Sequence, residues 1–146
     1  MSLPDALRFT GLQVTSLITG VMAVVLGCYY FAPEERFRRP LTPGHPSLVA
    51  YIDQLGPVWP MVFLWMGIAL ILAITARRYV VPAHILAVFG WMFYGSALLI
   101  GEGIPETAPT SVVTGAIAVG VAGIHFGLMQ AHHDQGDGPT RRKCKR

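Results

Sequence analysis

Two histidines in apolar surroundings are the residues whose type and position could carry chemistry. His84 falls about one turn into the apolar segment 80–101, and His125 falls deep in the segment 110–131. Ionisable side chains inside a membrane are energetically expensive, so each is a functional candidate. On neighbouring helices, two imidazoles could bind haem or a metal ion, or relay protons. The alternative, in which each ring donates a hydrogen bond to a carbonyl or an interfacial water, is favoured because no third ligand or carboxylate is visible near them. We therefore predict no metal and no cofactor.

Motifs of familiar enzymes do not occur in the sequence. It contains no glycine-rich phosphate loop, no nucleophile elbow and no HExxH zinc motif. Glu102 and Glu106 are four residues apart, but the glycine and proline between them favour a solvated loop over a cation-attracting mouth. Cys28 and Cys144 are expected at opposite ends of the membrane, so no disulfide is predicted. We predict a protein that is not an enzyme.

The elements that must position these residues are four apolar helices. The chain has 146 residues, of which 53% are hydrophobic and 13% charged, whereas soluble domains carry about 25% charged residues. A helix of roughly 20 apolar residues crosses a bilayer core of about 30 Å. The sequence predicts an all-α integral membrane bundle of four transmembrane helices in one domain, 1–131, followed by a disordered basic tail, 132–146. The predicted spans are about 11–31, 58–76, 80–101 and 110–131, and a short surface helix is expected at Leu48–Leu55.

Small residues recur along three of these segments at spacings that place them on one helical face. In lipid, such residues let helix backbones approach closely. The last segment also carries the GxxxG pair of Gly123 and Gly127, so the other helices are expected to pack around it. Some of these faces would close the monomer and one would remain for contact between copies. The predicted helix-packing residues are Ser16, Gly20, Ala23, Gly27, Ala83, Ala87, Gly90, Ala116, Gly120, Gly123 and Gly127.

The distribution of Lys and Arg predicts the orientation in the membrane. Four spans put the N-terminus, the second loop and the tail on one side, which holds eight basic residues against three on the other. Because basic residues concentrate on the cytoplasmic side, both termini are predicted to be cytoplasmic, in the inner membrane. The eight are Arg8, Arg77, Arg78, Arg141, Arg142, Lys143, Lys145 and Arg146.

The charged segments are candidates for contact with partners or lipids. The outer loop 32–57 is rich in proline and carries Arg36, Arg38 and Arg39, which could contact a protein partner or belong to a solvated connector. The basic tail favours anionic headgroups at the cytoplasmic face. Because the positive charge is concentrated in this tail, nucleic-acid binding is not predicted.

A resemblance gives one concrete function. Pro82-Ala83-His84, Gly90-Trp91-x-Phe93-Tyr94-Gly95-x-Ala97 and the glycine-rich last segment resemble the four-span membrane proteins of actinobacterial phages, some of which are called holins. The resemblance covers roughly residues 57–131. It implies a holin-like protein that oligomerises in the cytoplasmic membrane and permeabilises it. The alternatives are a non-enzymatic accessory subunit or a superinfection-blocking protein acting through loop 32–57, and a cofactor carrier using His84 and His125.

Overall fold

All regular elements in the described part of the chain are helices. The structure is a computed structural model that describes residues 10–31, 48–101 and 110–137. Four of its helices are long and apolar enough to cross a membrane, which confirms the predicted all-α fold. The helices are α1 (Gly11–Phe31), α3 (Leu48–Gln54), α4 (Val58–Thr75), α5 (Val80–Gly101) and α6 (Thr110–Asp137).

The helix boundaries follow the sequence closely at every end but one. α1 and α5 begin and end at the predicted residues, α4 ends one residue early, and α3 is the expected short helix. The prediction of a disordered tail from residue 132 is wrong for 132–137, which continue α6. Polar residues do not themselves stop a helix, and the first strong breakers are the glycines and proline of 136–139. Residues 138–146 lie outside the described part.

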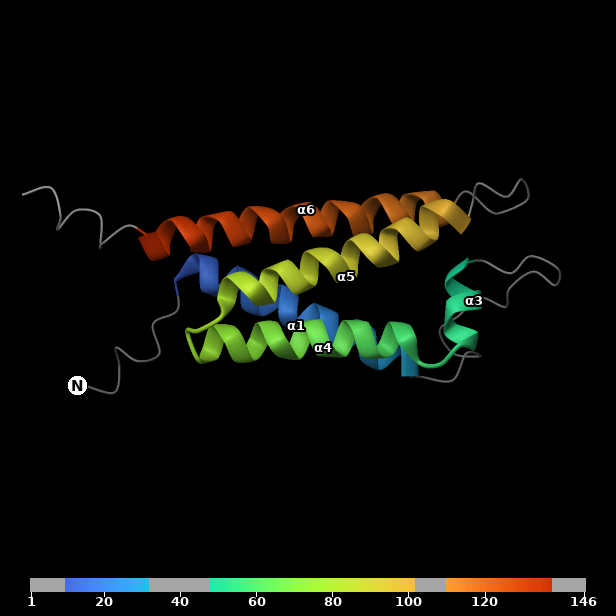
Figure 1. Cartoon of the computed structure of the whole chain (residues 1–146), viewed down its shortest axis with the longest axis horizontal. Helices are drawn as coiled ribbons and strands as arrows, with labels where there is room; N and C mark the ends of the chain where they lie inside the picture. Colours follow the sequence, from blue (N-terminus) through green and yellow to red (C-terminus); the bar gives the residue numbers. More distant parts are fainter. Residues whose placement is uncertain (1–9, 32–47, 102–109, 138–146) are drawn as a thin grey trace, which may run out of the picture.

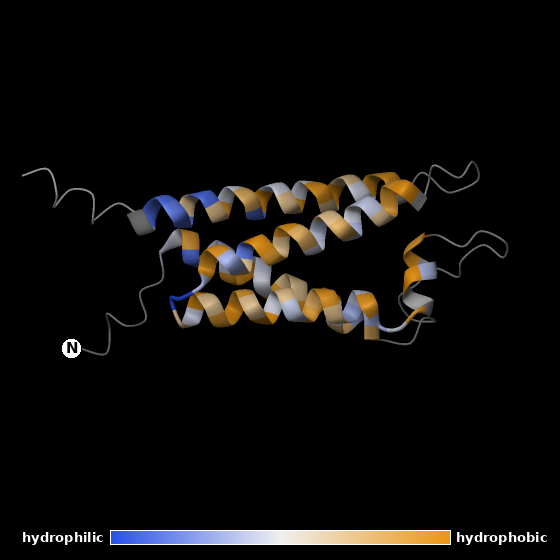
Figure 2. Cartoon of the chain, viewed as in Figure 1, coloured by the Kyte–Doolittle hydropathy of each residue, from blue (hydrophilic) through white to orange (hydrophobic). Residues whose placement is uncertain are grey.

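The long helices form two antiparallel pairs. α1 lies beside α4, and α5 lies beside α6, with the hairpin between α4 and α5 linking the pairs (Figure 1). The short helix α3 lies across one end of the bundle. The ends of α1 and α6 that are nearest the chain termini lie together at the opposite end. Apolar residues cover most of each long helix, and hydrophilic residues gather at that same end (Figure 2).

Glycines set the close approach within the α1–α4 pair. A Cβ atom added to Gly67 would lie 2.7 Å from the Gly20 carbonyl oxygen and 2.8 Å from the Val24 amide nitrogen. One added to Gly27 would lie 3.0 Å from the Leu64 amide nitrogen. These are backbone atoms, which cannot swing aside as a side chain can. The pair therefore packs backbone against backbone, as membrane helices with small interfacial residues do.

The α5–α6 pair also has glycines where the two helix backbones approach closely. A Cβ atom on Gly95 would lie 3.1 Å from the Gly115 carbonyl oxygen, and one on Gly115 would lie 3.2 Å from that of Gly95. Ala118 and Ala122 continue this contact along α6 and are both buried. α4 and α5 meet less closely, because the sulfur of Met66 fills the space over Gly90.

The largest buried side chains belong to α4 and not to the last segment, around which the sequence predicts the other helices to pack. α4 contributes the largest buried apolar side chains: Trp59, Phe63, Met66, Leu70 and Ile74. On its other side, Trp65 and Leu72 are 64% and 60% exposed and would face lipid. Large side chains fill the space between helices, so α4 supplies most of the apolar core, whereas the small residues of α6 fill little of it.

The hairpin between α4 and α5 places ordinary residues in the left-handed backbone region. Arg77 has φ +52° and Tyr79 has φ +60°. The Arg78 amide donates to the Ala73 carbonyl at 3.0 Å, which closes the end of α4 in a Schellman-type turn. Glycine is the usual residue in such a position, because an L side chain there strains the backbone.

Replacement of Gly67 by Ala is expected to destabilise the bundle by ~1–3 kcal/mol, since the new methyl group meets backbone that must move. Gly120→Ala is the matched control, because a Cβ atom there meets nothing within 4 Å. Thermal unfolding in detergent, followed by circular dichroism, measures the difference. Equal melting temperatures for the two variants would contradict the close approach of α1 and α4.

At the hairpin, Arg77→Gly is expected to be more stable than Arg77→Ala by roughly 1 kcal/mol, because only glycine adopts the positive φ without strain. Both variants lose the same charge, so the comparison isolates the backbone. The same unfolding measurement tests it, and an Ala variant as stable as the Gly variant would show that the turn carries no such strain.

Candidate functional site

Four polar side chains gather inside the bundle, near the end where α6 finishes. Ser16 comes from α1, His84 from α5, and His125 and His132 from α6. Ser16, His84 and His125 have no exposed surface, and His132 is half-buried. We call these four residues the histidine chain. Buried polar groups in an apolar surrounding are costly unless they are hydrogen-bonded, and lipid tails offer them no partner.

Three hydrogen bonds join the four residues in a row. The Nε2 atoms of His132 and His84 lie 3.2 Å and 3.0 Å from the Ser16 hydroxyl oxygen. On the other edge of its ring, the Nδ1 atom of His84 lies 3.0 Å from the Nδ1 atom of His125. The order is therefore His132, Ser16, His84, His125. These bonds connect α1 of one helix pair with α5 and α6 of the other.

One end of the histidine chain is incomplete. The Nε2 atom of His125 is buried and has no hydrogen-bond partner among the described residues. Trp91 Nε1, two turns after His84 on α5, is the other buried side-chain atom in this condition within the described part of the chain. An unsatisfied polar atom in such a place is costly, so each atom marks a position where a further polar group could bind.

The sequence identified half of this site. It singled out His84 and His125, which the fold brings together, and it placed Ser16 only in a packing face. The bonds of these histidines run to each other and to Ser16, where backbone carbonyls or water were expected. His132 was assigned to the solvated tail. Its spacing of seven from His125 puts the two on one helical face, which was the available signal.

A second cluster, of aromatic side chains, lies further along the bundle toward α3. Trp91 and Tyr94 of α5 surround Phe63 of α4, each with ring centroids 5.1 Å from it. Tyr30 of α1 stacks on Phe63 at 5.9 Å and shares a 2.5 Å hydrogen bond with the Tyr94 hydroxyl. Trp59 Nε1 donates to the Val49 carbonyl of α3 at 3.0 Å. These side chains contact one another and form part of the apolar core.

The predicted helix-packing residues divide by helix. In α1 all four predicted residues are buried. In α5, Ala83 and Ala87 are buried and Gly90 contacts Met66. In α6 the four members of the predicted face are exposed, and nothing lies within 4 Å of a Cβ atom on its three glycines, so this face packs against none of the other described helices. These four residues, the open face of α6, are Ala116, Gly120, Gly123 and Gly127.

The open face lies nearly opposite the surface that α6 uses inside the chain. That buried surface consists of Gly115, Ala118, Ala122 and His125. At about 100° per residue, the two faces are separated by roughly 150° around the helix. Both faces contain small residues at helical spacing, so spacing could not tell which one packs. The buried face is the one whose row includes the histidine.

Most of the charged candidates fall outside the part of the chain that the structure describes. These candidates are Arg8, the loop residues Arg36, Arg38 and Arg39, the carboxylates Glu102 and Glu106, and the basic residues of the tail. Of the predicted basic positions, Arg77 and Arg78 are described, at the α4–α5 hairpin. Within the described part, no group of three or more His, Cys, Asp or Glu side chains is arranged to hold a metal ion.

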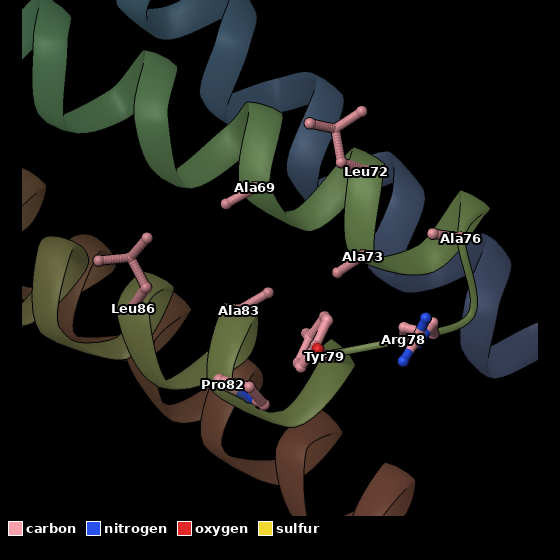
Figure 3. A pocket seen from close by; sticks show the side chains of 9 residues that line it. All are labelled: Ala69, Leu72, Ala73, Ala76, Arg78, Tyr79, Pro82, Ala83 and Leu86. Atoms are coloured by element: carbon pink, nitrogen blue, oxygen red, sulfur yellow. The ribbon is translucent and has the colours of Figure 1, made fainter.

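A groove of about 380 Å³ lies between α4 and α5 beside this hairpin (Figure 3). Its walls are Ala69, Leu72, Ala73, Ala83 and Leu86, with Arg78 and Tyr79 at the hairpin end. The groove is open and almost wholly apolar. It offers a surface to an acyl chain but no set of polar groups that could perform a reaction.

The fold and these clusters define a multi-pass membrane protein, a bundle of four transmembrane helices with a polar interior at one end. No protein-family model matches the chain, and neither the curated proteins nor the solved structures contain a match.

The hydrogen bond between Tyr30 and Tyr94 is expected to couple α1 to α5 by about 0.6 kcal/mol, the average for bonds between membrane helices. Tyr30→Phe and Tyr94→Phe keep both rings and remove only the hydroxyls. A double-mutant cycle on unfolding free energies measures the coupling. Additive effects of the two substitutions would show that the bond adds no stability.

Proposed function

We propose that the protein is holin-like: it oligomerises in the cytoplasmic membrane and permeabilises it. The observation that carries this proposal is the open face of α6. A Cβ atom on any of its three glycines would meet nothing within 4 Å, so no contact within the described residues uses the missing side chains. A helix from another copy can approach such a surface until backbones touch.

The remaining glycine contacts make α6 the natural helix for this association. Gly67 and Gly95 each lie at a contact already made within the chain. α6 contacts mainly α5 and reaches α1 only near one end, so one side of it is left uncovered. The exposed Ile117 and Ile124 on the outer side of α6 would add van der Waals contacts around the glycines.

The charge distribution supports a place in the cytoplasmic membrane with both termini inside. Arg77 and Arg78 occupy the hairpin at the same end of the bundle as the terminal ends of α1 and α6. In this orientation the histidine chain lies in the cytoplasmic half. The resemblance to phage-encoded four-span proteins agrees with the assignment.

Double replacement of Gly123 and Gly127 by Leu is expected to abolish permeabilisation. The new side chains occupy free space in the monomer, so the fold is retained, but they hold a second helix away. The measurement is induced expression in a bacterial host, with membrane potential and viability followed together. The wild-type chain should depolarise the cells abruptly at a set time, and the variant should accumulate without doing so.

The matched control is Val21→Leu with Val25→Leu, which places two leucines four residues apart on the exposed surface of α1 and leaves α6 unchanged. This control should kill as the wild-type chain does. Equal lethality of the glycine variant would refute the role of the open face. Cells that accumulate wild-type protein with an intact potential would refute permeabilisation and favour the alternative of an accessory or superinfection-blocking protein.

A further inference from the structure

We propose that the histidine chain is a proton relay that carries protons through the interior of each bundle. The proposal does not depend on oligomerisation. It rests on the row of three hydrogen bonds and on the unpartnered Nε2 atom at its buried end. A relay requires that every member can both donate and accept a proton, and imidazole and hydroxyl groups are the side chains that do so at neutral charge.

The geometry allows two arrangements of the protons. In the first, His132 Nε2–H donates to Ser16 Oγ, and the Ser16 hydroxyl donates to His84 Nε2. The Nδ1–H group of His84 then donates to His125 Nδ1, which leaves the His125 proton on Nε2. In the second arrangement every donor becomes an acceptor. His125 Nδ1–H donates toward His84, and Nε2 of His125 is bare.

Passage from the first arrangement to the second moves one proton. A proton binds His132 Nδ1, and each hydrogen bond hands one proton to its neighbour. The Nε2–H bond of His125 then breaks and releases a proton at the buried end. Four N–H or O–H bonds form and four break, so each group is neutral before and after. The reverse sequence moves a proton toward His132. Before a second proton can move in the same direction, the rings and the hydroxyl must return to the first arrangement. Proton conduction by the relay should therefore be slower than proton leakage through an open pore.

The relay covers part of the distance across the membrane. His125 and His132 are seven residues apart, or about 10 Å along α6, against a bilayer core of about 30 Å. His132 lies near the end of α6, where a proton can arrive from water. Beyond His125, Trp91 Nε1 and the hydroxyl pair of Tyr30 and Tyr94 supply polar atoms farther along the interior. Water molecules bound by these atoms would continue the route.

A purely structural role for these residues would differ from a relay in two respects. As a clamp, the histidine chain would need a single arrangement of its hydrogen bonds. As a relay, it needs both. Hydrogen bonds that only hold the helices together also gain nothing from an unsatisfied nitrogen. A relay, in contrast, uses His125 Nε2 as the atom that passes the proton on. The number of hydrogen-bond arrangements can be measured.

The test compares proton flux through the wild-type chain and Ser16→Ala in liposomes. Vesicles contain the pH dye pyranine, and a potassium gradient with valinomycin supplies the driving potential. Ser16→Ala removes the single hydroxyl that links two imidazoles, with little change in volume. Wild-type vesicles should acidify or alkalinise as the potential directs, and Ser16→Ala should lose most of this flux. His133→Asn, at an exposed histidine outside the row, is the matched control and should conduct normally.

Release of trapped calcein from parallel vesicles separates this result from pore formation. A pore that leaks protons would release the dye and would be indifferent to Ser16. Equal flux through Ser16→Ala and the wild-type chain, or no flux through a folded wild-type chain, would overturn the relay. Either result leaves the holin-like proposal to its own test with the glycine variant.

A second measurement covers the case in which Ser16→Ala perturbs the fold. Nitrogen NMR of labelled histidines in the wild-type protein distinguishes Nδ1–H from Nε2–H rings. The relay predicts that His84, His125 and His132 each populate both tautomers. One fixed tautomer at each ring would contradict the relay and support a static clamp.

Discussion

The close approach of helix backbones at a few glycines is the constraint on which this structure depends. Inside a membrane the apolar side chains are already out of water, so the hydrophobic effect does not drive helices together. Association depends instead on van der Waals packing and hydrogen bonds between helices. Gly67 against Gly20, and Gly95 against Gly115, bring two pairs of helices into backbone contact. The large side chains of α4 fill the space between the pairs, and the polar residues occupy what remains near one end.

The two pairs are joined by chemistry that differs along the bundle. Toward α3, aromatic rings from α1 and α5 pack around Phe63 of α4, and Tyr30 and Tyr94 also share a hydrogen bond. At the other end, imidazoles and one hydroxyl link α1, α5 and α6. An apolar cluster of this kind only packs. In a row of hydrogen bonds, the donors can all point one way along the row or all point the other way. The histidine end is therefore the better candidate for an activity of the single chain.

The two proposals use different surfaces of α6. Its inner face carries His125 into the bundle, and its outer face presents glycines with nothing above them. A helix at the edge of a bundle can serve both purposes because its faces have separate environments. Association of copies would therefore leave the histidine chain intact, and a change in the histidine chain would leave the open face intact. The separation makes each role accessible to substitution without the other.

The sequence by itself determined the number of spanning helices, nearly all of their limits and the short α3 helix, because an uninterrupted apolar run bounded by glycine and proline has one stable form in lipid. It also marked His84 and His125 as costly residues. Only the tertiary structure decided which small-residue face of α6 packs, that α4 supplies the largest buried side chains, and that Ser16 and His132 join the two histidines. Helical spacing fixes which residues share a face, but the partner of a face depends on the shapes of the neighbouring helices. A contact between Ser16 and His132 spans 116 positions, and no local pattern records it.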